Sequence, residues 1–226
     1  MVPDIEIGCQ TAGGRLLDVA SQLQAVAVNS PVSDYTIPDL ALPRGDLWVF
    51  GYGSVMWRPG FDYMERRPGR LHGYHRALCV WSWFHRGSPN SPGLVLGLDV
   101  GGSCNGIAYR VDASDKHAAA DYLYRRELVT DGYEAMLVRV YLNDGPVTAA
   151  VTAPVTAPVT ALCFRANRQH PQYAGKLDHG HAADVVHQSK GNSGANSDYV
   201  ASAVEQLQVM GFNDRVLANI NRLVAE

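Results

Sequence analysis

The sequence predicts one globular domain of mixed strands and helices, residues 47–226, which follows a partly flexible N-terminal extension, residues 1–46. Runs of bulky apolar and β-branched residues, typical of strands, begin at Trp48, and amphipathic helical patterns follow them along the chain. The 226 residues, of which 46% are hydrophobic, suffice for one domain with a sizeable core. Residues 1–46 instead carry scattered glycine and proline, and only a short amphipathic helix is expected there, from Leu16 to Leu23.

Charge and cysteine content exclude several functional classes. The formal net charge is -3, so there is no basic surplus for nucleic acid and no polybasic run for an anionic membrane. Cys9, Cys79, Cys104 and Cys163 form no Cys-x-x-Cys pair and are expected to be free thiols in a reducing compartment. The N-terminus lacks the pattern of a secretory signal, and no apolar run is long enough to span a membrane. We therefore expect a cytoplasmic protein that acts on a small or polar ligand.

The most distinctive stretch is a strand that runs into a glycine loop. Residues 48–50 are bulky and apolar, and Gly51-Tyr52-Gly53-Ser54 follows them. Glycine lets another group approach the main chain closely, so the backbone N–H groups of such a loop are free to bind a ligand. The loop matches neither the dinucleotide fingerprint, nor the phosphate P-loop, nor the serine nucleophile elbow. The residues alone leave open whether it is a binding loop or an ordinary turn.

A second candidate feature is a carboxylate on the apolar face of a predicted helix, residues 113–128. Leu123 and Glu127 lie four residues apart, so they share one face, and Leu123 marks that face as buried. Burial and the negative end of the helix dipole both raise the pKa of Glu127, whereas the flanking Arg125 and Arg126 oppose this effect. The pattern suits either a group that transfers protons near neutral pH or a structural Arg–Glu pair.

The remaining elements are predicted from periodicity and turn residues. Strands are expected over residues 71–83, 93–100, 106–111, 136–142 and 162–166, and helices over 178–186, 196–210 and from 214 onwards. Residues 101–105 are interpreted as a hairpin connection between two strands. Asp112 or Ser114 is expected to cap the helix that carries Glu127, and Gly132 to end it. Asn196 or Ser197 is expected to cap the helix that begins there.

A four-residue Pro-Val-Thr-Ala repeat fills residues 146–161. We interpret it as a low-complexity loop insertion, an exposed and dispensable spacer whose last copy runs into the strand that begins near Leu162. The histidine pairs His72/His75 and His179/His181 would diverge on a strand and on a helix respectively, so no metal site is predicted.

Together these motifs identify a family resemblance. Eight segments match in order: Phe50–Pro59, Gly73–Arg76, Ser82–Pro89, Pro92–Asp99, Gly101–Cys104, Ala108–Val111, Tyr122–Leu128 with Gly132-Tyr133, and Ser193–Tyr199. The sequence resembles the ChaC family of γ-glutamylcyclotransferases, which act on glutathione, from about Trp48 to Leu223. Val55, Ala195 and the pair Ser197-Asp198 depart from the family pattern, and Ala195 puts the rigidity of its loop in doubt.

The resemblance implies a fold, a reaction and a set of site residues. The fold is an α+β arrangement, a compact mixed β-barrel surrounded by helices. The reaction is that of a carbon–nitrogen lyase that releases 5-oxoproline and Cys-Gly from glutathione, with Glu127 as catalytic general base and then acid. No metal and no cofactor is expected. The substrate-binding residues are expected to be Val49, Phe50, Gly51, Tyr52, Gly53 and Ser54, which would hold the α-carboxylate of the γ-glutamyl group.

Several alternatives stay open at this point. The same chemistry on other γ-glutamyl amino acids or amines, or a non-catalytic regulatory protein on the same fold, would also fit the resemblance. Arg86 is either a partner for the glycine carboxylate of glutathione or part of a surface salt bridge, and Tyr133 and Tyr199 are candidate hydroxyl donors. The sequence makes no prediction about the oligomeric state.

Overall fold

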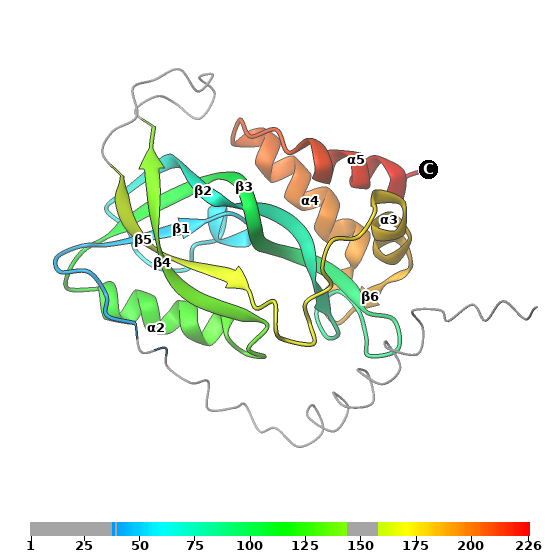
Figure 1. Ribbon diagram of the computed structural model, residues 1–226, viewed down its shortest axis with the longest axis horizontal. Helices are drawn as coiled ribbons and strands as arrows, with labels where there is room; N and C mark the ends of the chain where they lie inside the picture. The colour runs from blue at the N-terminus through cyan, green and yellow to red at the C-terminus, as the bar shows by residue number, and fades with distance from the viewer. Residues whose placement is uncertain (1–37, 39, 144–157) are drawn as a thin grey trace, which may run out of the picture. The chain divides into compact units, whose positions relative to one another are not determined.

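Five strands form a closed barrel in the order β1-β3-β2-β4-β5 (Figure 1). The computed structural model describes residues 38, 40–143 and 158–226; the expected helix near Leu16 and most of the repeat lie outside them. The strands are β1 (Leu47–Gly51), β2 (Glu65–Ser82), β3 (Gly93–Val111), β4 (Tyr133–Leu142) and β5 (Val159–Ala166). Neighbouring strands are antiparallel except β1 and β5, which run parallel and close the barrel. This confirms the expected mixed β-barrel.

Helices cover the barrel in two places. In Figure 1, α2 (Lys116–Glu127) lies on one side of the barrel, and α3 (His179–Gln188), α4 (Asn196–Val209) and α5 (Arg215–Val224) gather on the other. The last three helices contact one another, and α3 and α4 also contact β3. A short 3-10 turn, η1 (Ser54–Met56), and a small hairpin of β6 (Lys190–Gly191) and β7 (Gly194–Ala195) complete the described elements.

Two buried clusters divide the core. Alternate residues of a strand point to opposite faces, so Val49 and Phe50 of β1 belong to different clusters. Val49 belongs to a cluster that also contains residues of all four helices, such as Leu123 of α2. Phe50 packs with strand residues such as Cys163 and with Tyr52 of the glycine loop, and this cluster fills the barrel interior. The loop after β1 therefore begins where the barrel interior ends.

The expected hairpin at residues 101–105 is wrong, because β3 is one continuous strand. His72 pairs with Ser103 and Tyr74 pairs with Val100, so two residues of β3 oppose one residue of β2. Such a β-bulge bends a strand without ending it. Gly101 and Gly102 both have positive φ, 103° and 70°, which only glycine adopts without strain. Glycines that looked like a turn in the sequence instead bend a long β2–β3 hairpin.

The ends of α2 also differ from the prediction. The Asp112 carboxylate accepts hydrogen bonds from the Ser114 N–H and hydroxyl, which forms a turn before the helix, and neither residue caps it. The helix ends at Glu127, and Gly132 lies beyond it, just before β4. Glu127 is thus the last helical residue and not an interior one.

The helices after the barrel follow the prediction more closely. Helix α3 begins after Asp178, whose side chain accepts a hydrogen bond from the His181 N–H, and the last copy of the repeat runs into β5 as expected. Asn196 does not cap α4 and is instead buried against β3. In α5, Leu217 and Ile220 are buried, whereas Val216 is half exposed.

Candidate active site

The glycine loop folds back tightly at the mouth of the barrel. A Cβ atom at Gly51 would lie 3.0 Å from Val55 Cγ1 and 3.1 Å from the Met56 nitrogen, so a side chain there would be crowded. Met56 N–H donates to Gly53 O at 2.8 Å, and Arg58 N–H donates to Ser54 O at 2.8 Å. Among the turn and loop hydrogen bonds of the described residues, the N–H groups of Tyr52 and Gly53 donate none. They remain free to bind an anion.

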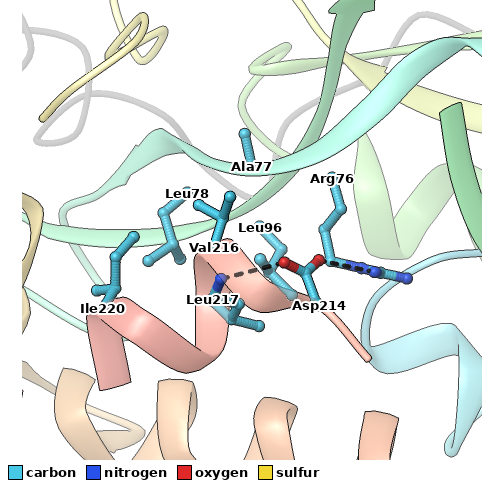
Figure 2. Close-up of a pocket in the computed structure, with 8 residues that line it drawn as sticks. All are labelled: Arg76, Ala77, Leu78, Leu96, Asp214, Val216, Leu217 and Ile220. Atoms are coloured by element: carbon cyan, nitrogen blue, oxygen red, sulfur yellow. Dashed lines mark hydrogen bonds and ion pairs between the residues drawn. The ribbon is translucent and has the colours of Figure 1, made fainter. Parts of the chain in front are cut away.

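The buried side chain of Arg76, only 6% exposed, fastens this loop to the rest of the fold. Its Nε donates to Tyr52 O at 2.6 Å, and its Nη2 donates to Asn105 O at 2.7 Å. Its Nη1 pairs with Asp214 Oδ2 at 3.0 Å, and the same carboxylate accepts from the Leu217 N–H at the start of α5 (Figure 2). A loop on β1 and a helix near the C-terminus are thereby held through one guanidinium.

Sequence reasoning assigned no role to Arg76, although a signal was present. The residue directly precedes the apolar run of residues 77–81, and a charged side chain that is buried beside such a run needs a partner. The cavity beside the Arg76–Asp214 pair has a volume of about 10 Å³, which holds at most one water molecule. The pair is therefore a support for the loop and not a place for substrate.

Glu127 and Ser54 are brought together by Arg126. The Arg126 Nε lies 3.1 Å from Glu127 Oε1, with the two side chains 23% and 20% exposed. The Arg126 Nη2 donates to Ser54 Oγ at 2.7 Å, and Nη1 donates to Arg58 O at 2.7 Å. The predicted catalytic carboxylate and the end of the predicted binding loop thus share one guanidinium.

Burial raises the pKa of Glu127, and the positive charge of Arg126 partly opposes this. The direction agrees with the expectation from the sequence, and the Arg–Glu pair that the sequence left as an alternative is also present. The Arg126–Glu127 pair is incompletely buried, and desolvation destabilises the charged form of the Glu127 carboxylate. Glu127 is therefore suited to exchange a proton. The structure thus shows the Arg–Glu pair, and the raised pKa of its carboxylate is also compatible with proton transfer.

Three tyrosines surround this carboxylate closely enough to interact with it electrostatically: Tyr52, Tyr133 and Tyr199. Burial raises the pKa of each phenol, that of Tyr199 to about 12, so all three are neutral at physiological pH. Tyr133 donates to Leu96 O at 2.8 Å, whereas Tyr199 accepts from Leu96 N–H at 3.1 Å. The Tyr199 hydroxyl therefore keeps its own proton for a further acceptor.

The other residues predicted to bind substrate lie in two different environments. Val49 lies between β3 and β5 within the sheet and is almost fully buried. Phe50 is buried in the barrel interior, and Tyr52 closes that interior at its mouth. Ser54 is the loop residue that contacts the Glu127 side of the site, through Arg126. Val49 and Phe50 can therefore take part only through their backbone or by supporting the loop.

Neither a reactive thiol nor a metal cluster occurs in the part of the chain that the structure describes. Cys79, Cys104 and Cys163 are free and buried, and burial raises the pKa of all three thiols, that of Cys79 to about 12. His72 packs edge-on against Tyr141, and His75 Nδ1 is hydrogen-bonded to Gly101 O at 3.0 Å. No group of three His, Cys, Asp or Glu side chains among the described residues could hold a metal ion.

Among these residues no helix has the length and apolar character needed to cross a membrane.

Comparisons with known proteins agree on one family. The family model described as ChaC-like protein matches residues 47–226. A Homo sapiens protein named glutathione-specific gamma-glutamylcyclotransferase 1 is 34% identical over 197 residues, which cover 84% of this chain and 85% of that protein. An Escherichia coli (strain K12) protein named glutathione-specific gamma-glutamylcyclotransferase is 31% identical over 187 residues, covering 81% of this chain and 76% of that protein.

The fold has a counterpart among solved structures. A crystal structure of a yeast γ-glutamyl cyclotransferase described as specific to glutathione superimposes with a TM-score of 0.70 and 21% sequence identity. The match covers 80% of this chain and 96% of the yeast chain. The barrel with its surrounding helices is therefore the γ-glutamylcyclotransferase-like fold.

Proposed function

Because the chain belongs to the family of ChaC-like proteins, we propose that it is a γ-glutamylcyclotransferase that cleaves glutathione into 5-oxoproline and Cys-Gly. In this reaction the α-amine nitrogen of the γ-glutamyl group forms a bond to its own γ-carbonyl carbon. The amide bond to the cysteine nitrogen then breaks. The observation that carries the proposal is the buried Glu127 carboxylate, joined through Arg126 to Ser54 of the free backbone loop.

Glu127 moves the proton that the reaction must transfer. The attacking amine loses a proton as the ring closes, and the departing Cys-Gly nitrogen gains one as the amide bond breaks. One carboxylate can accept the first proton and deliver the second, so it is regenerated at the end of each turnover. General acid–base assistance of this kind contributes about 10²- to 10⁴-fold in rate. The raised pKa of Glu127 brings it closer to the working pH, which favours both steps.

The glycine loop would hold the substrate for this attack. Free N–H groups at Tyr52 and Gly53, together with the Ser54 hydroxyl, suit a carboxylate, as do backbone nests elsewhere. We assign the binding of the γ-glutamyl α-carboxylate to Val49, Phe50, Gly51, Tyr52, Gly53 and Ser54. A fixed carboxylate also fixes the amine on the same carbon. Well-oriented intramolecular attack corresponds to effective molarities of roughly 10⁵–10⁸ M, and the substrate supplies its own nucleophile.

The same proposal includes the substrate, the partners and the cellular compartment of the enzyme. Relatives that carry the name glutathione-specific support glutathione over other γ-glutamyl compounds. Net charge -3 gives no support to nucleic acid or an anionic membrane as a partner. The free thiols of Cys79, Cys104 and Cys163 suit a reducing compartment, and we assign the enzyme to the cytoplasm. We further propose that residues 47–226 form the catalytic domain and that residues 146–161 are an inserted loop.

Product analysis tests this function. The purified protein is incubated with glutathione and, separately, with γ-glutamyl-alanine, and 5-oxoproline and the released amine are quantified. We expect equal amounts of 5-oxoproline and Cys-Gly from glutathione and little product from γ-glutamyl-alanine. Similar rates with both substrates would show a broader γ-glutamyl specificity. Binding of glutathione without any 5-oxoproline would show a non-catalytic protein on the same fold.

A further inference from the structure

Arg86 is a cation fixed in place beside the active site. It follows β2, and its Nη1 donates to Ser193 O at 2.7 Å and to Ala195 O at 3.3 Å, in the β6–β7 hairpin. Two further bonds hold the same loops together, from Asn192 N–H to the carbonyl of residue 84 and from Ser193 N–H to that of residue 85. The guanidinium lies over the Tyr199 ring, 5.3 Å from its centroid. Its position is therefore set before any ligand arrives.

The same guanidinium keeps an unused pair of donors. None of the ion pairs among the described residues includes Arg86, so the surface salt bridge considered from the sequence is not formed within them. Both protein hydrogen bonds of its side chain use Nη1. The Nε and Nη2 atoms carry three more N–H groups, of which one from each atom points along the same edge. That edge matches the two oxygens of a carboxylate.

Arg86 and Glu127 are both neighbours of Tyr199. The Arg86 guanidinium lies over the Tyr199 ring, and the Tyr199 phenol is close enough to Glu127 to interact with its negative charge. Arg126 is paired with Glu127, and Arg76 is paired with Asp214. Among these three arginines around the site, Arg86 is the one that lacks an acidic partner within the described residues.

We propose that Arg86 binds the carboxylate at the far end of the substrate, the glycine carboxylate of glutathione, and so selects the tripeptide. The inference rests on the proposed function, since the γ-amide must lie at Glu127. A γ-glutamyl group held by the glycine loop then directs the rest of the peptide across Tyr199 towards the free edge of Arg86. A γ-glutamyl amino acid has no carboxylate at that distance and leaves this edge unpaired, which disfavours its binding.

A substrate–enzyme double-mutant cycle tests the proposal. The kcat/KM is measured for glutathione and for its C-terminal amide, in which the glycine carboxylate becomes a neutral carboxamide. The wild-type enzyme should prefer glutathione by about 10- to 100-fold, the effect of one charge-assisted hydrogen-bonded contact. Arg86→Gln keeps an N–H donor for Ser193 O but removes the charge, and should bring the preference close to one, mainly by raising KM for glutathione. Arg125→Gln, on the exposed face of α2, should keep the wild-type preference.

Each outcome decides between separate claims. If the wild-type protein releases no 5-oxoproline from glutathione, the proposed function itself is wrong. If it turns over both substrates equally, or if Arg86→Gln keeps the full preference, the function stands and the role of Arg86 is wrong. The preference is a ratio within one preparation, so partial unfolding does not affect it. Should Arg86→Gln be inactive, Arg86→Lys, which keeps the charge but not the paired donors, must show a reduced preference, and an unchanged one overturns the proposal.

Discussion

Arg126 sets how readily Glu127 takes up a proton, and this is testable at one residue. Burial raises the pKa of Glu127 and the adjacent cation lowers it. Arg126→Met removes the cation, so the pKa of Glu127 rises further and the carboxylate is protonated at a higher pH. Since the reaction needs the unprotonated base, the acidic limb of the kcat/KM profile should move to higher pH. Activity at pH 6 should fall by about tenfold or more, the effect of one lost charge-assisted bond.

Arg125→Met is the matched control for this change. Arg125 is the neighbouring residue, 68% exposed, and pairs with Asp121 on the surface of α2. Exposed pairs contribute little, so its pH profile should coincide with that of the wild-type enzyme. An unshifted acidic limb in Arg126→Met would mean that a group other than Glu127 titrates in that limb.

At the scale of elements, Asn196 joins α4 to β3. The side chain is fully buried; its Oδ1 accepts from Leu94 N–H at 2.6 Å, and its Nδ2 donates to Leu94 O at 2.8 Å. Asn196→Ala leaves two buried backbone groups without partners, at about 1–3 kcal/mol each. We expect the free energy of unfolding in urea to fall by about 2–4 kcal/mol. Asn192→Ala, in the exposed tip of the β6–β7 hairpin, should change it by less than about 0.5 kcal/mol, and equal losses would contradict this role.

Local patterns predicted most elements but not their connections. The strand of residues 48–50, the helix that carries Glu127 and the strand near Leu162 follow from hydrophobic periodicity, and all are present. Asn196 was misread as a cap because asparagine before a helix is usually one, whereas its partner lies 102 residues away in β3. The bulge at Gly101 was misread as a turn because bulges and turns use the same glycines.

For the whole molecule, residues before β1 also contribute to the fold. Leu40 and Leu42 pack against the helix-facing core, and Lys116 Nζ donates to Pro43 O at 3.1 Å. A variant that lacks residues 1–33 should keep its activity and its Tm. Removal of residues 1–46 should lower the Tm by about 5–10 °C, because it removes two leucines whose burial against the core contributes roughly 2–3 kcal/mol together. Differential scanning fluorimetry distinguishes the two, and equal Tm values would mean that this segment is dispensable.

The global arrangement could be expected only from the family resemblance. Closure of the barrel by parallel pairing of β1 with β5 joins residues more than one hundred positions apart, and periodicity carries no information on such contacts. The candidate site, likewise, could be predicted from the sequence only in part. Glu127 and the glycine loop were predicted as separate features, but Arg126 as their link and Arg76 as the support of the loop depend on tertiary packing.

Replacement of Glu127 by glutamine tests the central claim most directly. Glutamine fills the same space and can still accept a hydrogen bond from Arg126, but it cannot take up a proton. We expect kcat for 5-oxoproline release from glutathione to fall by about 10²- to 10⁴-fold, with KM and Tm near the wild-type values. Glu134→Gln removes another arginine-paired carboxylate, that of β4 with Arg165, and should keep normal turnover. If Glu127→Gln instead keeps a kcat close to that of the wild-type enzyme, Glu127 does not transfer the proton.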